Sequence, residues 1–194
     1  MIINLEKIGG FILYTKDKLV KSAQHLLITK GFHKMNVSDI VDDAGFGKGT
    51  FYTYFDSKLD LVSYFASVIL DEMVNELNEI PYNKDKSKTI NNIIEVIFNY
   101  NKKNKDIIES LYHSFIGSGN LNEWESIYSK FYDRVEELLF SKKDTSTNLK
   151  AQIIVGTIEH AAEQSYIFIK ENSVDVEKRK KLVGEMLTDI IRCA

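Results

Sequence analysis

The residues best suited to bind another molecule are concentrated in one short segment between Gly31 and Leu61. Basic and hydroxyl-bearing side chains gather there around a glycine: Lys48, Gly49, Thr50, Tyr52, Thr53, Tyr54 and Lys58. Ammonium and hydroxyl groups donate hydrogen bonds to phosphate oxygens and to the edges of bases. A glycine lets the backbone come close to a partner because it carries no side chain. This combination predicts contact with a nucleic acid.

Two short helices joined by a tight turn are predicted to position these side chains. Asn36, with Asp39 three residues later, can cap the first helix. The apolar face of that helix is Val37, Ile40, Val41 and Ala44. Gly45 permits the positive φ of a tight turn, and a second helix from about Lys48 to Tyr54 follows. Such a pair is a helix-turn-helix, whose second helix enters the major groove of DNA.

The next helix begins with a cation at its N-terminus. Ser57 and Asp60 form the pattern of a capping box, and Lys58 lies in the first turn. A positive charge there opposes the helix dipole. A bound phosphate would explain it, because the free amides of the first turn attract the same anion. We therefore predict that Lys58 contacts the DNA backbone.

The segment resembles the N-terminal signature of the TetR family of repressors. The matching residues are Gly31-Phe32, Asn36 to Val41, Ala44 to Phe55, Ser57-Lys58 and Leu61, within a stretch that starts at Lys16. The groove residues that the resemblance implies are Lys48, Gly49, Thr50 and Thr53. The phosphate contacts that it implies are Tyr52, Tyr54 and Lys58. Asn36 and Ser38, at the start of the preceding helix, complete the predicted DNA-binding set.

The sequence departs from the family pattern in three places. Asn36 and Gly47 stand where the family usually has threonine and serine. Both are accepted N-caps, so we expect little loss of function. The family often has a basic arm before its first helix, whereas Met1 to Thr15 is mainly apolar here. This composition argues against contact of the arm with the minor groove.

The rest of the chain has helical periodicity, and we predict an all-α fold of about nine helices. One helix at about Lys16–Gly31 precedes the helix-turn-helix, and a long one follows from Ser57 to Pro81. A polar linker at 81–88 leads to helices at about 87–102, 106–116, 122–140, 147–171 and 175–192. Breaks are expected at 117–119, 142–144 and 172–173.

We divide the chain into three parts. Residues 1–15 are an apolar N-terminal extension of unknown role, and residues 16–60 are the helix-turn-helix DNA-binding domain. Residues 61–194 are a larger ligand-binding and dimerisation domain, an assignment implied by the resemblance because this region has no signature of its own. No cofactor and no metal site are predicted.

Composition and charge are those of a folded soluble protein, with 44% hydrophobic and 27% charged residues. The formal net charge of −3 is not typical of a nucleic-acid binder. Residues 1–60 contain eight lysines against seven acidic residues, so they carry a small positive charge while the remainder is acidic. DNA binding must therefore depend on a local surface.

The location of the protein is predicted from its cysteine content and its first residues. Cys193 is the only cysteine, which excludes an intrachain disulfide and fits a reducing compartment. It is then a spectator thiol or, alternatively, an interchain bridge in a dimer. Charged residues and glycines interrupt the apolar start, which is too short to span a membrane. We expect a cytoplasmic protein that does not bind membranes.

The C-terminal region is rich in aromatic residues that can either fill a core or line a ligand pocket. The resemblance favours a pocket among the middle helices, and the candidate lining is Tyr112, Phe115, Trp124, Tyr128 and Tyr166. Glu159, His160 and Glu163 lie within little more than one helical turn. They could recognise a cation or form a salt bridge, but their number is too small to propose zinc.

The last two helices carry apolar stripes that a second copy of the chain could cover. The stripe residues are Ile153, Ile154, Gly156, Thr157, Ala161, Leu182, Val183, Met186, Leu187 and Ile190. The resemblance implies that such stripes form a four-helix dimer interface. A two-fold dimer doubles the number of bases that one short recognition helix can read.

Together these features predict a ligand-responsive transcriptional regulator, a homodimeric repressor that a small-molecule effector releases from double-stranded operator DNA. An architectural protein that binds DNA without sequence choice is the alternative. An enzyme is a further rival, but it has no nucleophile–base arrangement, phosphate loop or cysteine cluster in its favour. Activation instead of repression is compatible with the same sequence.

Overall fold

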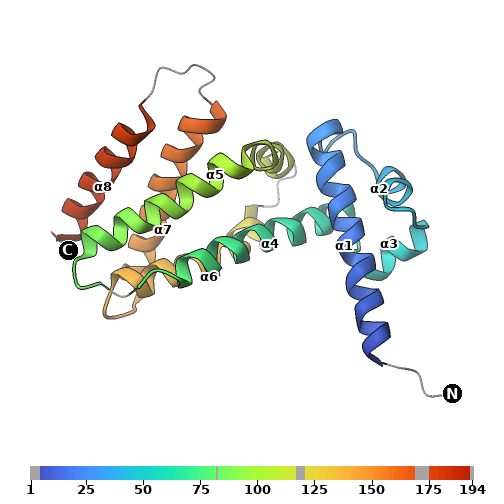
Figure 1. Ribbon diagram of the computed structural model, residues 1–194, viewed down its shortest axis with the longest axis horizontal. Helices are drawn as coiled ribbons and strands as arrows, with labels where there is room; N and C mark the ends of the chain where they lie inside the picture. The colour runs from blue at the N-terminus through green and yellow to red at the C-terminus, as the bar shows by residue number, and fades with distance from the viewer. Residues whose placement is uncertain (1–4, 82, 117–120, 169–174, 193–194) are drawn as a thin grey trace. The chain divides into compact units, whose positions relative to one another are not determined.

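The computed structural model describes the backbone of residues 5–81, 83–116, 121–168 and 175–192, and the side chains of 14–81, 83–111, 126–168 and 175–191. Within these ranges the chain forms eight α-helices and one π-helix and has no strand (Figure 1), so the predicted all-α fold is confirmed. None of the helices in the described ranges is long and apolar enough to cross a membrane.

The first helix, α1 (Leu5–Lys30), is longer than the sequence predicted. It includes most of the predicted N-terminal extension, because two glycines weaken a helix without removing its hydrogen bonds. Gly31 follows with φ of 76°, the left-handed conformation that ends the helix as expected.

The two short helices have the predicted bounds, α2 (Val37–Ala44) and α3 (Lys48–Tyr54). Asn36 Oδ1 accepts a hydrogen bond from the Asp39 amide at 3.1 Å, and Asp39 Oδ2 accepts one from the Asn36 amide at 2.9 Å. Gly45, with φ of 76°, ends α2. Both ends were predictable because each depends on residues only a few positions apart.

The long helix α4 (Lys58–Asn78) starts after Ser57, whose Oγ accepts from the Asp60 amide at 3.1 Å. The Asp60 carboxylate accepts from the amide of Asp56 at 2.9 Å, one residue before the position that a strict capping box requires. The helix ends before Pro81, as predicted.

The predicted helices at 87–102 and 106–116 are one element, α5 (Lys86–Ile116), with a kink in place of a break. Asn104 has non-helical angles, φ of −114° and ψ of 21°, and its Nδ2 donates to the Tyr100 carbonyl at 3.1 Å. The helix resumes directly after this residue. Helix α6 (Leu121–Leu139) follows, and the predicted break at 117–119 lies outside the described residues.

The last elements are α7 (Thr145–Glu163), a π-helix (Gln164–Phe168) and α8 (Val176–Arg192). The predicted break at 142–144 is confirmed, since Asp144 caps α7 through the amides of Ser146 and Thr147. The break expected at 172–173 lies outside the described residues. The prediction of one regular helix over 147–171 was wrong, because the helical hydrogen bonds change register at Gln164.

Contacts divide the chain into two compact units, which we call the N-terminal unit (residues 1–67 and 109–124) and the C-terminal unit (68–108 and 125–194). The core of the N-terminal unit includes Leu19, Leu27, Met35, Ile40, Phe51, Phe55 and Leu61. The core of the C-terminal unit includes Ile90, Ile93, Ile97, Phe98, Phe131, Val135, Ile154, Ile158, Ala162 and Leu187. Helices α4 and α5 each contribute residues to both units.

Candidate nucleic-acid interface

Helix α3 separates its apolar and polar residues sharply. Phe51 and Phe55 are buried in the core of the N-terminal unit, with their ring centroids 5.8 Å apart. The residues exposed on α3 are Lys48, Gly49, Tyr52 and Thr53, and those half-buried are Thr50 and Tyr54. The helix thus presents most of the predicted contact residues on the face opposite its two phenylalanines.

The turn before α3 fixes the direction of that face. The Phe46 amide donates to the Val41 carbonyl at 2.8 Å, and the Gly45 amide donates to the Asp42 carbonyl at 3.3 Å. Among the described residues, apart from the immediate neighbours and backbone of its own helix, no atom lies within 4 Å of the point where a Cβ on Gly49 would sit. Packing inside the chain therefore gives no reason for glycine there, whereas a partner approaching the backbone would.

Three other predicted contact residues have local structural roles or little exposed surface. Asn36 is exposed, but its side-chain oxygen caps α2. Thr53 Oγ1 donates to the Gly49 carbonyl at 3.0 Å, and Ser38 is half-buried at the start of α2. DNA contact by these three residues stays a prediction.

Lys58 lies in a setting that the sequence did not suggest. Its Nζ donates to the carbonyl oxygens of Phe32 and Met35, each at 2.7 Å, and lies 4.3 Å from the centroid of the Phe32 ring. The residue is half-buried, and this burial lowers the pKa of its ammonium group. The partners are more than twenty residues away in sequence, so no local pattern could have indicated them. The predicted phosphate contact of Lys58 stays untested.

Further charged contacts hold the same unit together and were not predicted. Lys30 pairs with Asp39 at 2.7 Å, and this contact, with the amide of Asn36, lowers the pKa of the Asp39 carboxyl. The ammonium of Lys16 lies 3.5 Å from the centroid of the Tyr64 ring, which joins α1 to α4. Sequence spacing does not reveal the role of Lys16, because its partner also comes from a distant element.

The structure describes the side chains of two of the five candidate ligand residues, and both of these lie in the C-terminal unit. Tyr128 is buried, and its hydroxyl donates to Glu159 Oε1 at 3.0 Å. Tyr166 is half-buried and packs edge-on against Phe98, with centroids 6.2 Å apart. The side chains of Tyr112, Phe115 and Trp124 lie outside the described residues.

Glu159 has an unusual environment on α7. Desolvation, helped by the negative charge of Glu163, raises its pKa to about 8, although the hydroxyl of Tyr128 opposes this shift. Glu163 is buried, whereas His160 is exposed. His160 and Glu163, which lie within one turn of each other, are therefore divided between solvent and interior.

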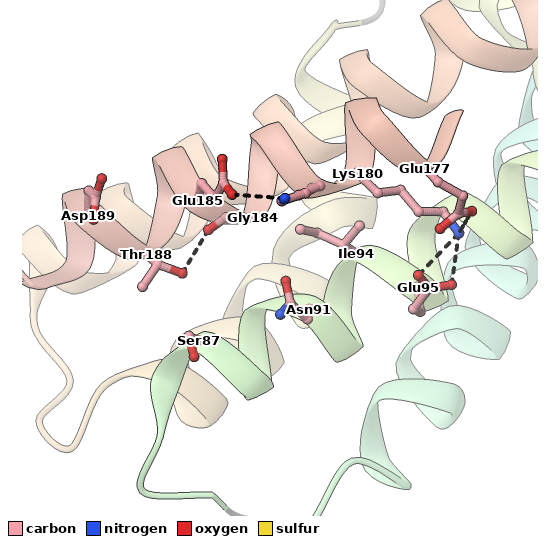
Figure 2. Close-up of a pocket in the computed structure, with 11 residues that line it drawn as sticks. Ser87, Asn91, Ile94, Glu95, Glu177, Lys180, Gly184, Glu185, Thr188 and Asp189 are labelled. Carbon is pink, nitrogen blue, oxygen red and sulfur yellow. Dashed lines mark hydrogen bonds and ion pairs between the residues drawn. The ribbon is translucent and has the colours of Figure 1, made fainter. Parts of the chain in front are cut away.

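An open groove of about 780 Å³ runs between α5 and α8 (Figure 2). Figure 2 shows Lys180 of α8 directed at Glu95 of α5, with Nζ to carboxylate distances of 2.9 and 3.1 Å. The same ammonium lies 3.0 Å from Glu177. Gly184 allows α8 to lie close to Asn91 of α5, because a Cβ at this position would be 2.6 Å from Oδ1 of Asn91. The groove was not predicted from the sequence. Its one sequence signal is the glycine inside α8, since a glycine within a helix can mark a close approach to another element.

The apolar stripes of α7 and α8 divide into two sets. The residues buried in the C-terminal unit are Ile154, Ala161, Val183 and Leu187. The exposed residues are Ile153, Gly156, Leu182, Met186 and Ile190, and Thr157 is half-buried. Ile153 is 63% exposed and Met186 59%, so these two helices show water an apolar surface that the unit itself does not cover.

An all-α protein with an N-terminal helix-turn-helix and a larger helical unit belongs to the class of helical DNA-binding regulators. Two family models match the chain: "Bacterial regulatory proteins, tetR family" over residues 19–65 and "Tetracyclin repressor-like, C-terminal domain" over residues 90–191. The chain is a member of the TetR family of bacterial DNA-binding regulators.

Relatives and solved structures agree with this assignment. YvdT of Bacillus subtilis strain 168, an uncharacterized HTH-type transcriptional regulator, is 27% identical over 173 residues, which cover 84% of this chain and 89% of YvdT. The fatty acid degradation regulator FadR of Bacillus halodurans has a TM-score of 0.68 at 20% identity, covering 89% and 94% of the two chains. FadR of Bacillus subtilis in complex with stearoyl-CoA has a TM-score of 0.67 at 18% identity, covering 88% and 96%. These names describe transcriptional regulators and not enzymes.

Proposed function

We propose that this protein is a homodimeric repressor that binds operator DNA through α3 and releases it when a small molecule binds the C-terminal unit. The observation that carries the DNA-binding part is the exposed face of α3, held outward by buried Phe51 and Phe55. Lys48, Gly49 and Thr50 are proposed at the groove, with Tyr52 and Tyr54 on phosphates. Such a regulator acts in the cytoplasm, where chromosomal DNA lies.

The proposed dimer forms through the exposed apolar residues of α7 and α8. Ile153 and Met186 lie on this surface, and covering them removes apolar area from water. A two-fold dimer presents two copies of α3 to half-sites about 34 Å apart, one turn of DNA. The dimer is therefore part of the DNA-binding function, because one seven-residue helix contacts few bases.

The proposed effector site is in the region 61–194, and residues 16–60 form the proposed DNA-binding domain. Buried Tyr128 and half-buried Glu159 supply a hydrogen-bonded polar pair of the kind that orients a ligand. The stearoyl-CoA complex of FadR supports the proposal, because that fold accommodates a small molecule. Release requires that the effector bind the DNA-free conformation more tightly than the DNA-bound one.

The test is fluorescence anisotropy of the purified protein with its own upstream intergenic DNA, at near-physiological salt, against a scrambled duplex. We expect a preference of about a thousandfold or more for the upstream DNA. The same assay then identifies compounds that release it. Equal, weak binding to upstream DNA, scrambled DNA and duplexes selected from the whole genome would instead support the architectural alternative.

A further inference from the structure

We propose that Lys58 is a positioning residue: its ammonium group holds the start of α4 to the turn that precedes α2, and acts on DNA binding through α2 and α3 instead of contacting a phosphate. This inference rests on the proposed function, because it assigns a role in DNA binding. It changes the role that sequence spacing gave to this residue.

The contacts of the Lys58 ammonium use most of its binding capacity. A lysine has three N–H donors. Two of them point to the carbonyl oxygens of Phe32 and Met35 at 2.7 Å, and the Phe32 ring covers the same group at 4.3 Å. A partly desolvated charge such as this one is costly unless it is well bonded. Lys48, by contrast, is exposed on α3.

The turn that Lys58 holds determines where α2 begins. Gly31 has a left-handed conformation, and the Met35 amide donates to the Gly31 carbonyl at 3.1 Å. Met35 is buried, and the next residue, Asn36, is the N-cap of α2. Because α3 follows α2 through one closed turn, a shift at Met35 would move the recognition helix.

The position of Lys58 along α4 gives this contact a second consequence. Leu61 and Val62, in the next turn, are fully buried in the N-terminal unit, and Tyr64 lies under the ammonium of Lys16. The helix continues past Ser67 into the C-terminal unit. Lys58 therefore holds the turn to the end of a helix that is continuous with the proposed effector region.

The experiment compares Lys58→Met and Lys58→Arg with Lys48→Met as the matched control, in the full-length protein. Operator affinity is measured by anisotropy over a range of salt concentrations, and amide hydrogen exchange of residues 32–40 is measured without DNA. Methionine keeps the stem of Lys58 without its charge. Arginine keeps the charge and binds phosphate at least as well as lysine, but its longer, planar group fits poorly where a single nitrogen lies 2.7 Å from two carbonyl oxygens.

We expect both Lys58 variants to bind the operator at least about tenfold more weakly, the loss expected for charged hydrogen bonds. Their salt dependence should equal that of the wild type, and exchange of residues 32–40 should be faster. Lys48→Met removes a cation that the proposed function places in the DNA groove, so it should instead lower both the operator affinity and the salt slope. The proposal is overturned if Lys58→Met lowers the slope in the same way, or if Lys58→Arg binds like the wild type.

The hydrogen-exchange arm separates this proposal from the proposed function. If the wild-type protein shows no preference for any DNA, the repressor proposal fails and exchange alone decides the role of Lys58. Unchanged exchange of residues 32–40 in both variants would then overturn it. If Lys58→Met does not fold, operator affinity and amide exchange of Lys58→Arg are compared with those of the wild type instead.

Discussion

Two surfaces of this protein expose opposite chemistry. Helix α3 shows Lys48, Tyr52 and Thr53 to solvent, whereas α7 and α8 show Ile153 and Met186. Water solvates the polar surface at no cost, so it can remain free until DNA arrives. Each square ångström of apolar surface left in water costs about 25 cal/mol, so the second surface favours a permanent partner. The difference fits the proposed function, a stable dimer that binds its DNA reversibly.

The largest effect on stability should come from truncating a buried side chain that holds the polar face of α3 outward. Phe51→Ala deletes a fully buried ring and should destabilise the protein by about 3–5 kcal/mol. Tyr52→Ala, its neighbour on the exposed side of α3, should change stability by less than about 0.5 kcal/mol yet weaken operator binding. Urea unfolding and anisotropy measure the two effects. Equal DNA affinity in Tyr52→Ala and the wild type would show that this face does not contact DNA.

The apolar surface is tested by placing a charge in its middle. Met186→Glu should convert the dimer to monomer and reduce operator affinity by at least about a hundredfold, because the monomer contacts one half-site. Sedimentation velocity and anisotropy measure both properties. Lys181→Glu, a charge reversal on the groove side of α8, is the control and should remain dimeric. A dimeric Met186→Glu variant would place the interface elsewhere.

Inside the C-terminal unit, Glu159 should make stability depend on pH. Its pKa is about 8 in the folded state against an ordinary value of 4.5, so the folded state binds the extra proton between these values. Stability should therefore fall by several kcal/mol as pH rises from about 5 to about 8 and level off above, because each unit of pKa shift is worth about 1.4 kcal/mol. Glu159→Gln should remove this dependence, as measured by urea unfolding at several pH values. An unchanged pH profile in the variant would assign the dependence to another group.

The smallest changes in stability are expected when one glycine in each unit is replaced by alanine. Gly49→Ala has open space and should stabilise α3 by about 0.5–1 kcal/mol, yet weaken DNA binding because a methyl group keeps the backbone from the duplex. Gly184→Ala would place a Cβ 2.6 Å from Oδ1 of Asn91, so this exposed side chain must turn away, and the gain in stability should be smaller than that of Gly49→Ala. Thermal unfolding and anisotropy measure both variants. If Gly49→Ala binds DNA like the wild type, close backbone approach is not needed there.

The helix-turn-helix was predictable from sequence because its signals are local. The N-cap at Asn36, the left-handed Gly45 and the apolar pair Phe51 and Phe55 lie within twenty residues of one another. The bounds of α2 and α3 and the exposed face of α3 therefore follow from spacing alone. The start of α7, by contrast, was predicted two residues late, at 147, because the capping role of Asp144 was not recognised.

Other features depend on contacts that spacing does not reveal. Sequence periodicity placed Ile153 and Ile154 in one stripe, but only the packed unit shows that Ile154 is buried and Ile153 exposed. The kink at Asn104 replaced an expected break, because one residue can leave the helical conformation without a loop.

For this protein, sequence by itself determined the all-α class, the family and the surface of α3, since capping, turn formation and helical periodicity act over a few residues. Tertiary structure decided the partners of Lys58 and Lys180 and the environment of Glu159. The physical reason is that burial and pairing of a charge depend on groups that other helices bring to it, and those groups lie far away along the chain.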